Sequence, residues 1–128
     1  MDHKQVKFFV TGYGAFSTFS LNPTDYVVNK MKKNPSKFIT DDGNYHLEFF
    51  RVSDVSAIGA LQTLLDLQSC HNQVSSKDDI CVFFHLGVYG DATEVNLEQR
   101  GYNEAKWGNP DTRNWTPRCQ KVSIDSFD

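Results

Sequence analysis

The sequence predicts an α/β fold: an open, mainly parallel, twisted sheet with helices on both faces, in three layers. Three observations lead to this class. Apolar segments typical of strands alternate along the chain with segments typical of helices. Glycine-containing loops follow the first and third apolar segments directly. The 128 residues are one domain's worth of chain, so we expect a single domain over residues 1–128.

The first strand is predicted over Gln5–Thr11, which is rich in Val and Phe and ends at Gly12. The first helix should begin at Asn22-Pro23-Thr24-Asp25. This tetrad supplies an N-cap side chain, a proline at the first helical position and an acid in the first turn. We expect the buried stripe of this helix to be Tyr26, Val27 and Met31.

The second strand is predicted over Tyr45–Val52, and Ser53 after it is able to cap a helix. That helix should cover Val55–Leu67, because apolar residues recur at spacings of three and four and would pack one face on the sheet. The stripe consists of Ile58, Leu61, Leu64 and Leu65. A polar loop is expected over Gln68–Asp79.

The third strand is predicted over Ile80–Leu86, a short apolar run typical of a buried strand, followed by Gly87. Farther on, Glu94–Asn103 alternates apolar and polar residues and is predicted to be a half-buried strand. By this alternation Glu98 would lie on the face opposite Val95 and Leu97. It is either a carboxylate pointed into a cleft or, as the pattern alone favours, a solvated strand-face glutamate. A last helix is predicted to start near Val122.

Right-handed crossovers bring the carboxyl ends of the three strands to one edge of the sheet, where ligands bind in such folds. The loops Gly12–Asn22 and Gly87–Thr93 should therefore face each other across a crevice. Its apolar walls would be Tyr13, Phe16 and Phe19.

Several kinds of site are not supported. Neither glycine loop has the third glycine of a dinucleotide fingerprint, and the Gly-Lys-Ser/Thr of a P-loop is missing, so we expect no nucleotide cofactor. The histidines and cysteines lack metal-ligand spacing, so no metal is expected. A histidine satisfied by the backbone is favoured over a catalytic one at His85, which ends the third strand.

Charge and cysteine content restrict partners and compartment. The net charge is −3, and the densest basic group is Lys30, Lys32 and Lys33, which argues against nucleic acid and anionic membranes as partners. No signal peptide or membrane span is predicted. The three cysteines lack disulfide-framework spacing. We therefore expect a cytosolic protein.

Two segments carry a resemblance to a known family. Thr11-Gly12-Tyr13-Gly14-Ala15-Phe16, followed by Asn22, resembles the N-terminal glycine-aromatic motif of pyroglutamyl-peptidase I, a family of cytosolic cysteine peptidases that remove N-terminal pyroglutamate. The segment His85–Thr93, with Glu98 and Gly101-Tyr102-Asn103 after it, resembles the family's histidine-glycine segment and its downstream catalytic glutamate. Pro110-Asp111 and Ser123-Ile124-Asp125-Ser126 continue in the same order.

The resemblance implies a function and a set of site residues. Glu98 would be the acid of a cysteine-histidine-glutamate set, and the partners would be peptides with N-terminal pyroglutamate. No cofactor is implied. The substrate-binding residues would be Tyr13, Phe16, Asn22, Gly87, Val88 and Gly90.

The chain departs from the family pattern at several positions. Ala15 replaces a proline, and Val52-Ser53-Asp54 replaces isoleucine-proline-valine, which puts a carboxylate near the expected apolar pocket. The family's nucleophilic cysteine and its histidine come after the serine-isoleucine-aspartate stretch, so Cys119, which precedes it, does not match the nucleophile. The resemblance thus covers nearly the whole chain but only the earlier part of the family pattern, and the fold is expected to be incomplete at the C-terminus.

Two functional interpretations remain open. In the first, the chain has the lineage of a cysteine peptidase but is inactive as it stands, with Glu98 the catalytic residue present. In the second, it is a non-catalytic fragment or pseudoenzyme module that binds a peptide end, a small cyclic amide or a partner chain. Either way we expect exposed apolar surface, and with it self-association.

Overall fold

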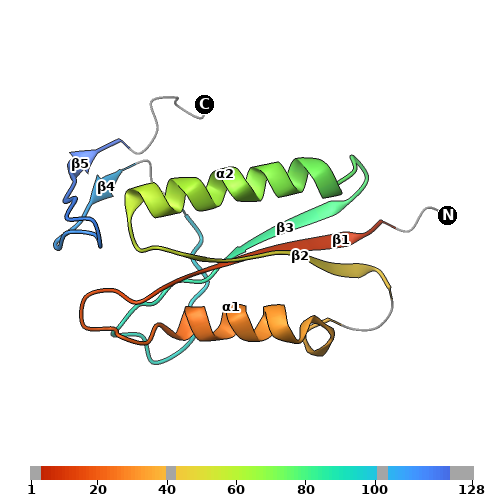
Figure 1. Ribbon diagram of the computed structural model, residues 1–128, viewed down its shortest axis with the longest axis horizontal. Coiled ribbons are helices and arrows are strands. Elements are labelled where there is room, and N and C mark those ends of the chain that lie inside the picture. Colours follow the sequence, from red (N-terminus) through yellow and green to blue (C-terminus); the bar gives the residue numbers. More distant parts are fainter. Residues whose placement is uncertain (1–3, 40–42, 101–103, 122–128) are drawn as a thin grey trace.

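The computed structural model describes residues 4–39, 43–100 and 104–121. Its centre is a parallel sheet with the strand order β2-β1-β3. Two helices cover the sheet on opposite faces, α1 on one and α2 on the other (Figure 1). The predicted α/β class is confirmed. The elements of this layer structure are β1 (Val6–Tyr13), α1 (Pro23–Lys33), the short 3-10 helix η1 (Pro35–Lys37), β2 (Tyr45–Ser53), α2 (Ala57–Val74) and β3 (Ile80–His85).

The central strand β1 is buried along most of its length, because β2 and β3 flank it and the helices cover it. Phe9 is fully buried and lies in register with Phe49 of β2 and Phe83 of β3. Phe9 and Phe49 form a core cluster with Leu67 of α2. The ring of Phe83 stacks on that of Phe9, with 5.1 Å between centroids. This cluster joins the three strands to α2.

Helix α1 begins as predicted, but it buries a different face. The Thr24 N–H donates to Asn22 Oδ1 over 3.0 Å, so Asn22 is the N-cap. The expected stripe is wrong, since Tyr26 and Val27 are exposed and the buried residues are Thr24 and Val28. The Thr24 hydroxyl explains the orientation, because it accepts from the Tyr13 N–H (2.8 Å) and thereby turns its own face of the helix toward the sheet.

Helix α1 also approaches β1 very closely at Gly12. A Cβ added there would lie 2.8 Å from the Thr24 carbonyl oxygen and 2.9 Å from Val28 Cγ2. Both distances are shorter than van der Waals contact, so this position accommodates no side chain without moving the helix.

Helix α2 is longer than predicted and packs through another face. It continues to Val74, so the loop expected from Gln68 is wrong over residues 68–74. Its cap is Ser56, whose Oγ accepts from the Gly59 N–H (2.9 Å), and not Ser53, which ends β2. Thr63 and Leu67 are buried, and Cys70 and Val74 pack against the core cluster. These residues recur at spacings of four, three and four and define the face on the sheet.

The predicted apolar stripe of α2 therefore points elsewhere. Ile58, Leu61, Leu64 and Leu65 each keep more than half of their surface exposed, so the expectation that they pack on the sheet is wrong. The expectation of exposed apolar surface is confirmed by the same residues.

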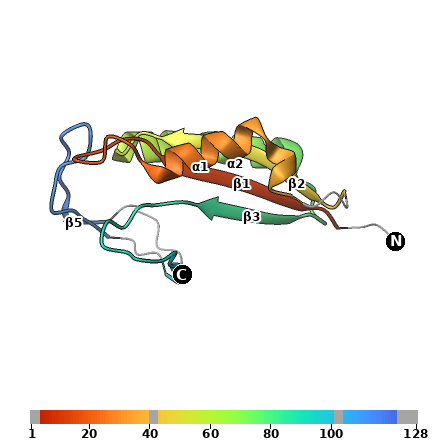
Figure 2. The same cartoon turned by 90° about the horizontal axis from the view of Figure 1, so that it is seen from below.

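Strand β3 is an edge strand and is less buried than predicted. It pairs with β1 alone among the described strands. Figure 2 shows both helices lying mainly over β1 and β2, with β3 beyond them. Ile80, Phe83 and Phe84 are each more than two-fifths exposed. Self-association through such an edge stays a prediction.

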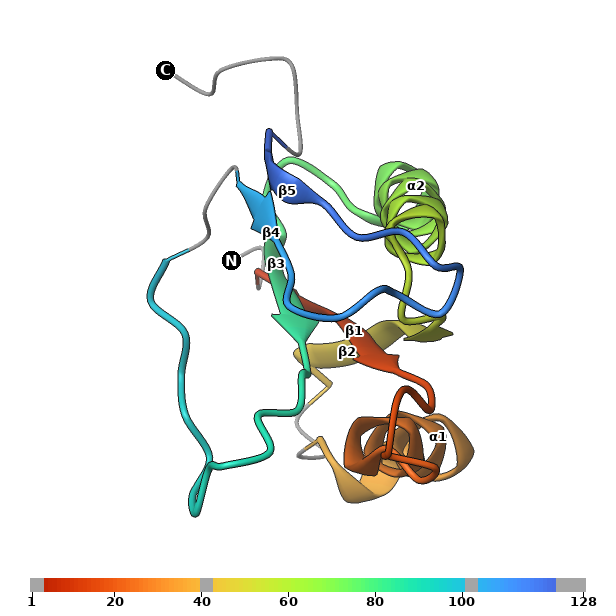
Figure 3. The ribbon, with the colours of Figure 1, turned by 90° about the vertical axis from the view of Figure 1, so that its left-hand side faces the viewer.

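The chain after β3 differs most from expectation. No strand forms over residues 94–100, where Val95 and Leu97 are exposed at 101% and 86%. Among the described residues, no strand pairs with this alternating segment. Residues 101–103 of that prediction, and the helix expected from Val122, lie outside the described residues. Instead, β4 (Ala105–Lys106) and β5 (Arg118–Gln120) pair antiparallel, and the loop between them reaches the N-terminal end of α2 (Figure 3).

Candidate ligand-binding cavity

A cavity of about 630 Å³ opens at the carboxyl ends of β1 and β3. The strand order β2-β1-β3 makes this the switch point of the sheet, because the chain leaves β1 toward one side and reaches β3 on the other. Ligands bind at such points in open α/β sheets, and pockets of roughly 300–1,000 Å³ are typical of small-molecule sites. The cavity is therefore the best candidate for a functional site within the described chain.

The first wall of the cavity is the end of β1 together with the loop from β1 to α1, and it contributes Tyr13, Phe16 and Asn22. This loop is held by main-chain bonds. The Gly14 N–H donates to the Ser53 carbonyl over 2.9 Å, and Phe16 and Phe19 exchange two backbone hydrogen bonds. The rings of Phe16 and Phe19 also stack, with 5.1 Å between centroids. The first wall is thus attached directly to the sheet.

Asn22 has a structural task in this wall. It is 4% exposed, and its Oδ1 accepts from both the N–H and the hydroxyl of Thr24. Its Nδ2 donates to the Gly14 carbonyl over 3.0 Å. Asn22 therefore joins the loop to the head of α1, and its second amide hydrogen has no partner among the described residues.

The loop after β3 faces the first wall, as predicted. Gly87 and Val88 line the cavity. Gly90 does not line it but lies against the first wall, since a Cβ added there would be 3.1 Å from Phe19 Cζ. The backbone N–H groups of Gly87 and Val88 make no hydrogen bond to any residue that the structure describes. Both N–H groups thus belong to residues of the cavity lining and have no partner among the described residues.

The second wall is the strap, which we define as residues 105–121. It contributes Trp107 and Trp115, together with Ala105 and Lys121. The two indole rings meet edge to face, with 5.2 Å between centroids and 79° between planes. Sequence reasoning missed these tryptophans. The signal available was their position on either side of Asn109-Pro110, a typical turn dipeptide.

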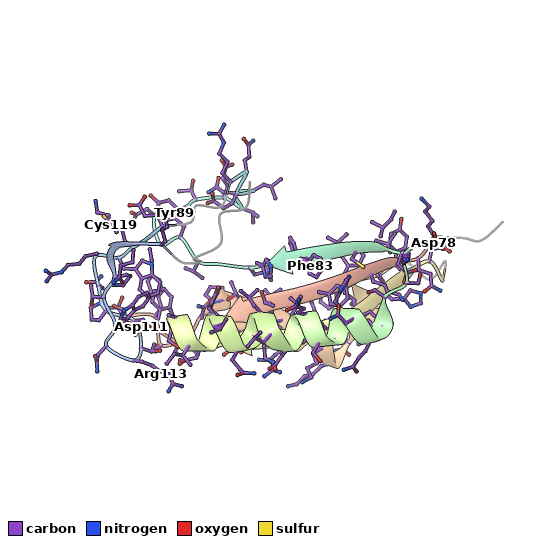
Figure 4. The ribbon with its side chains drawn as sticks, turned by 90° about the horizontal axis from the view of Figure 1, so that it is seen from above. Asp78, Phe83, Tyr89, Asp111, Arg113 and Cys119 are labelled. Atoms are coloured by element: carbon purple, nitrogen blue, oxygen red, sulfur yellow. The ribbon has the colours of Figure 1, made fainter. Side chains whose placement is uncertain are left out.

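Two carboxylates attach the strap to the head of α2. Asp111 Oδ2 accepts from the Ala57 N–H (3.0 Å), and its Oδ1 accepts from the N–H groups of Arg113 and Trp115. Asp54 accepts from the Thr112 hydroxyl (2.9 Å) and from Arg113 Nε (3.0 Å). Figure 4 shows Asp111 and Arg113 beside the N-terminal end of α2. We call Asp54 and Asp111 the clasp.

The clasp carboxylates are held in their charged form. Hydrogen bonds from Thr112, Ser56 and Arg113 lower the pKa of Asp54. Desolvation acts to raise the pKa of Asp111, but backbone hydrogen bonds from Trp115, Ala57 and Arg113 outweigh it and the pKa is lowered. Asp54 was expected to put a carboxylate near the apolar pocket; it does not line the cavity, because its oxygens are turned to the strap and to Ser56.

Cys119 has no features of an activated nucleophile. It lies on β5, exposed, with φ 58°. Desolvation and the neighbouring Glu104 raise the pKa of its thiol, so the thiolate is disfavoured at neutral pH. Cys70 and Cys81 are also free thiols, on α2 and β3.

His85 is satisfied by a side chain and not by the backbone. Its Nδ1 lies 2.6 Å from the Thr11 hydroxyl oxygen. Desolvation lowers the pKa of His85, which favours the neutral imidazole although the residue keeps exposed surface. His85 does not line the cavity.

Glu98 lies in the irregular, exposed segment before the strap and is not among the residues that line the cavity. Of the two placements left open by the sequence, the structure has the one that the pattern alone favoured, since Glu98 is exposed to solvent, but the strand expected to carry it does not form over residues 94–100. Its catalytic role stays a prediction. No group of three or more His, Cys, Asp or Glu side chains that could hold a metal ion is present in residues 4–39, 43–100 and 104–121. Nor does any helix in these ranges have the length and apolarity needed to cross a membrane.

The sheet order and the cavity at its switch point define a doubly wound α/β protein. A solved structure with the same fold is that of the pyrrolidone carboxyl peptidase from Thermococcus litoralis. The superposition has a TM-score of 0.71 and 20% sequence identity, and it covers 94% of this chain and 48% of that one. The chain thus spans about half the length of the peptidase it resembles. No family model and no curated protein matches the sequence.

Proposed function

We propose that this chain binds the N-terminal pyroglutamyl residue of peptides in the cavity at the switch point of its sheet. The observation that carries the proposal is the composition of this cavity. All but one of the substrate-binding residues implied by the resemblance to pyroglutamyl-peptidase I line it together: Tyr13, Phe16, Asn22, Gly87 and Val88. The fold shared with a pyrrolidone carboxyl peptidase supports the same ligand.

The chemistry of a pyroglutamyl end suits the walls. Its five-membered lactam ring has apolar edges, which Tyr13, Phe16 and Val88 would cover. The lactam carbonyl needs a donor, and the N–H groups of Gly87 and Val88, which have no partner within the described chain, would supply it. A buried carbonyl without such a donor costs about 1–3 kcal/mol, so these groups favour a ligand with a correctly placed carbonyl.

Charge favours a lactam over an ordinary peptide end. Among the described residues, the lining includes no carboxylate, and its one charged residue is Lys121. A protonated α-amino group entering this apolar site would lose hydration without a countercharge, whereas the lactam nitrogen is neutral. The cavity should therefore discriminate against peptides with a free amino terminus.

We also propose that the 128-residue chain binds without cleaving. Amide hydrolysis by a cysteine peptidase needs a thiolate, a histidine that moves its proton and a group that orients the imidazole. The raised pKa of the Cys119 thiol argues against the first role. The free thiols suit a reducing compartment, and we place this activity in the cytosol.

Calorimetric titration of the chain with pyroglutamyl-glycine amide tests the proposal. We expect saturable binding of this peptide and none of prolyl-glycine amide, which has a charged amine and no lactam carbonyl. Phe16→Ala should weaken binding about tenfold, because it removes an apolar wall. Phe38→Ala is the matched control, since Phe38 is exposed outside the cavity. Equal binding of the two peptides, or no binding, would refute the proposal.

A further inference from the structure

We propose that Trp107 and Trp115 form a second subsite of the cavity, which takes an aromatic or large aliphatic side chain at the residue following the pyroglutamyl ring. The inference rests on the proposed function and extends it to the choice of peptide. Both tryptophans of the chain lie on the strap, and both line the cavity. Each keeps 40% of its surface exposed. Indole faces at a cavity offer a large apolar contact area to a ligand.

The subsite is fixed before any ligand arrives. The Trp115 N–H donates to Asp111 Oδ1, and the Asp111 N–H donates back to the Trp115 carbonyl, both over 2.9 Å. The Trp107 N–H donates to the carbonyl of Pro117, which is fully buried. The Thr112 N–H donates to the Val55 carbonyl over 3.0 Å. The backbone that carries both indoles is already ordered in the free chain. Binding a ligand side chain therefore costs little free energy for ordering the strap.

The rest of the lining fits the same class of side chain. Leu61 and Leu64 of α2 line the cavity, and they keep 59% and 52% of their surface exposed. With a lactam against the first wall and the loop after β3, these leucines and the two indoles remain for the next residue. Lys121, the charged residue of the lining, would repel a lysine or arginine side chain there. The ligand is therefore a pyroglutamyl peptide with an apolar, preferably aromatic, second residue.

The test compares three peptide amides on the whole 128-residue chain: pyroglutamyl-phenylalanine, pyroglutamyl-glycine and pyroglutamyl-lysine. Affinity is measured by calorimetry. Tryptophan emission is recorded in parallel, because both fluorophores belong to the proposed subsite. We expect the phenylalanine peptide to bind about tenfold more tightly than the glycine peptide and to change tryptophan emission on binding. The lysine peptide should bind no better than the glycine peptide.

Variants locate the preference. Trp115→Ala and Trp107→Ala should reduce the ratio of the phenylalanine to the glycine affinity to about one. The conservative variants Trp107→Phe and Trp115→Phe, which keep an aromatic face and the fold, should retain most of the ratio. Tyr26→Ala is the matched control, because Tyr26 is exposed on α1 outside the cavity and its loss should leave the ratio unchanged.

The outcomes separate the inference from the function on which it rests. Equal affinity for the phenylalanine and glycine peptides would overturn the subsite and leave the pyroglutamyl site standing. A preference for phenylalanine that survives both alanine substitutions would also overturn it. If prolyl-phenylalanine amide bound as well as its pyroglutamyl counterpart, the subsite would stand and the lactam site would fall. Absence of binding by every peptide would overturn both.

Discussion

The two walls of the cavity are held in place by different interactions. The first wall is attached by main-chain bonds to β2 and by the buried, uncharged pair Asn22 and Thr24. The second wall is attached by the clasp carboxylates, which join the strap to the head of α2 through exposed and half-buried hydrogen bonds. Removing an anchor of the first wall therefore disturbs the fold, while removing an anchor of the second disturbs mainly the cavity.

This difference suggests that the first wall depends on the sheet and that the second wall is the more adaptable part of the cavity. Main-chain anchors tolerate almost any side chain facing the ligand, but they do not permit the wall itself to move. Side-chain anchors of an exposed strap allow it to be changed without loss of the sheet. Specificity for the second residue of a peptide is thus expected in the strap, and recognition of the ring in the first wall and the loop after β3.

The largest effect is expected from crowding the first wall. Gly12→Ala should lower the free energy of unfolding by about 2–3 kcal/mol, because the new Cβ would be pressed against a backbone carbonyl of α1 and a buried valine. Urea denaturation followed by circular dichroism measures the loss. Gly108→Ala is the control in the strap, where a Cβ meets nothing within 4 Å, and should change stability by less than about 0.5 kcal/mol. Equal losses would remove the contrast between the walls.

A smaller loss is expected from Asn22→Ala. Removing the N-cap should cost about 1–2 kcal/mol, and losing the bond to the Gly14 carbonyl should also loosen the loop that carries Tyr13 and Phe16. Stability and peptide affinity should therefore fall together in this variant. Asn29→Ala provides the comparison, since Asn29 is exposed on α1 and its side chain bonds to Asp25 within the same helix. A destabilised variant with unchanged affinity would show that the first wall does not contact the ligand.

The fold itself was largely predictable from local signals. Apolar runs ended by glycine marked β1 and β3, and Asn22-Pro23 marked the start of α1. The facing of the two loops followed from crossover handedness and did not need a measured contact. Local signals are sufficient where a residue's neighbours in sequence determine its conformation.

The faces of the helices and the strap were not predictable in this way. On α2, Leu61, Leu64 and Leu65 are exposed, while Thr63 and Cys70 join Leu67 on the face toward the sheet, so hydrophobicity alone selects the wrong side. The strap depends on contacts such as Thr112 to Asp54, which are far apart in sequence and carry no periodic signal. The strand predicted around Glu98 does not form over residues 94–100 for a related reason, since alternation produces a strand only where a partner strand is available.

Breaking the clasp should affect the second wall with little change in the sheet. Asp111→Ala leaves the Ala57 and Trp115 N–H groups without their acceptor. We expect tryptophan emission to shift to the red as the indoles gain water, while the far-ultraviolet spectrum at neutral pH stays that of the parent. Asp66→Ala removes a comparable exposed carboxylate, paired with Arg51, and should leave the emission unchanged. Concerted loss of sheet signal in Asp111→Ala would contradict independent anchoring.

Acid should loosen the second wall in the parent chain. Near neutral pH, where the clasp carboxylates are charged, we expect almost no change. The pKa values of Asp54 and Asp111 are lowered from the usual 3.8, so their stabilising contribution is present above that pH and is lost as pH falls through the lowered values. A red shift of tryptophan emission below pH 3.8 should therefore precede loss of the sheet signal. In the variant Asp54→Asn with Asp111→Asn this early transition should be missing.

The most direct test of the central claim is a nuclear magnetic resonance titration of the nitrogen-labelled chain with pyroglutamyl-glycine amide. The account predicts saturable shifts of the Gly87 and Val88 amide signals, because their N–H groups donate to the lactam carbonyl, with accompanying shifts at Tyr13 and Phe16. Shifts confined to the β3 edge around Phe83 and Phe84, or no shifts at millimolar peptide, would contradict it.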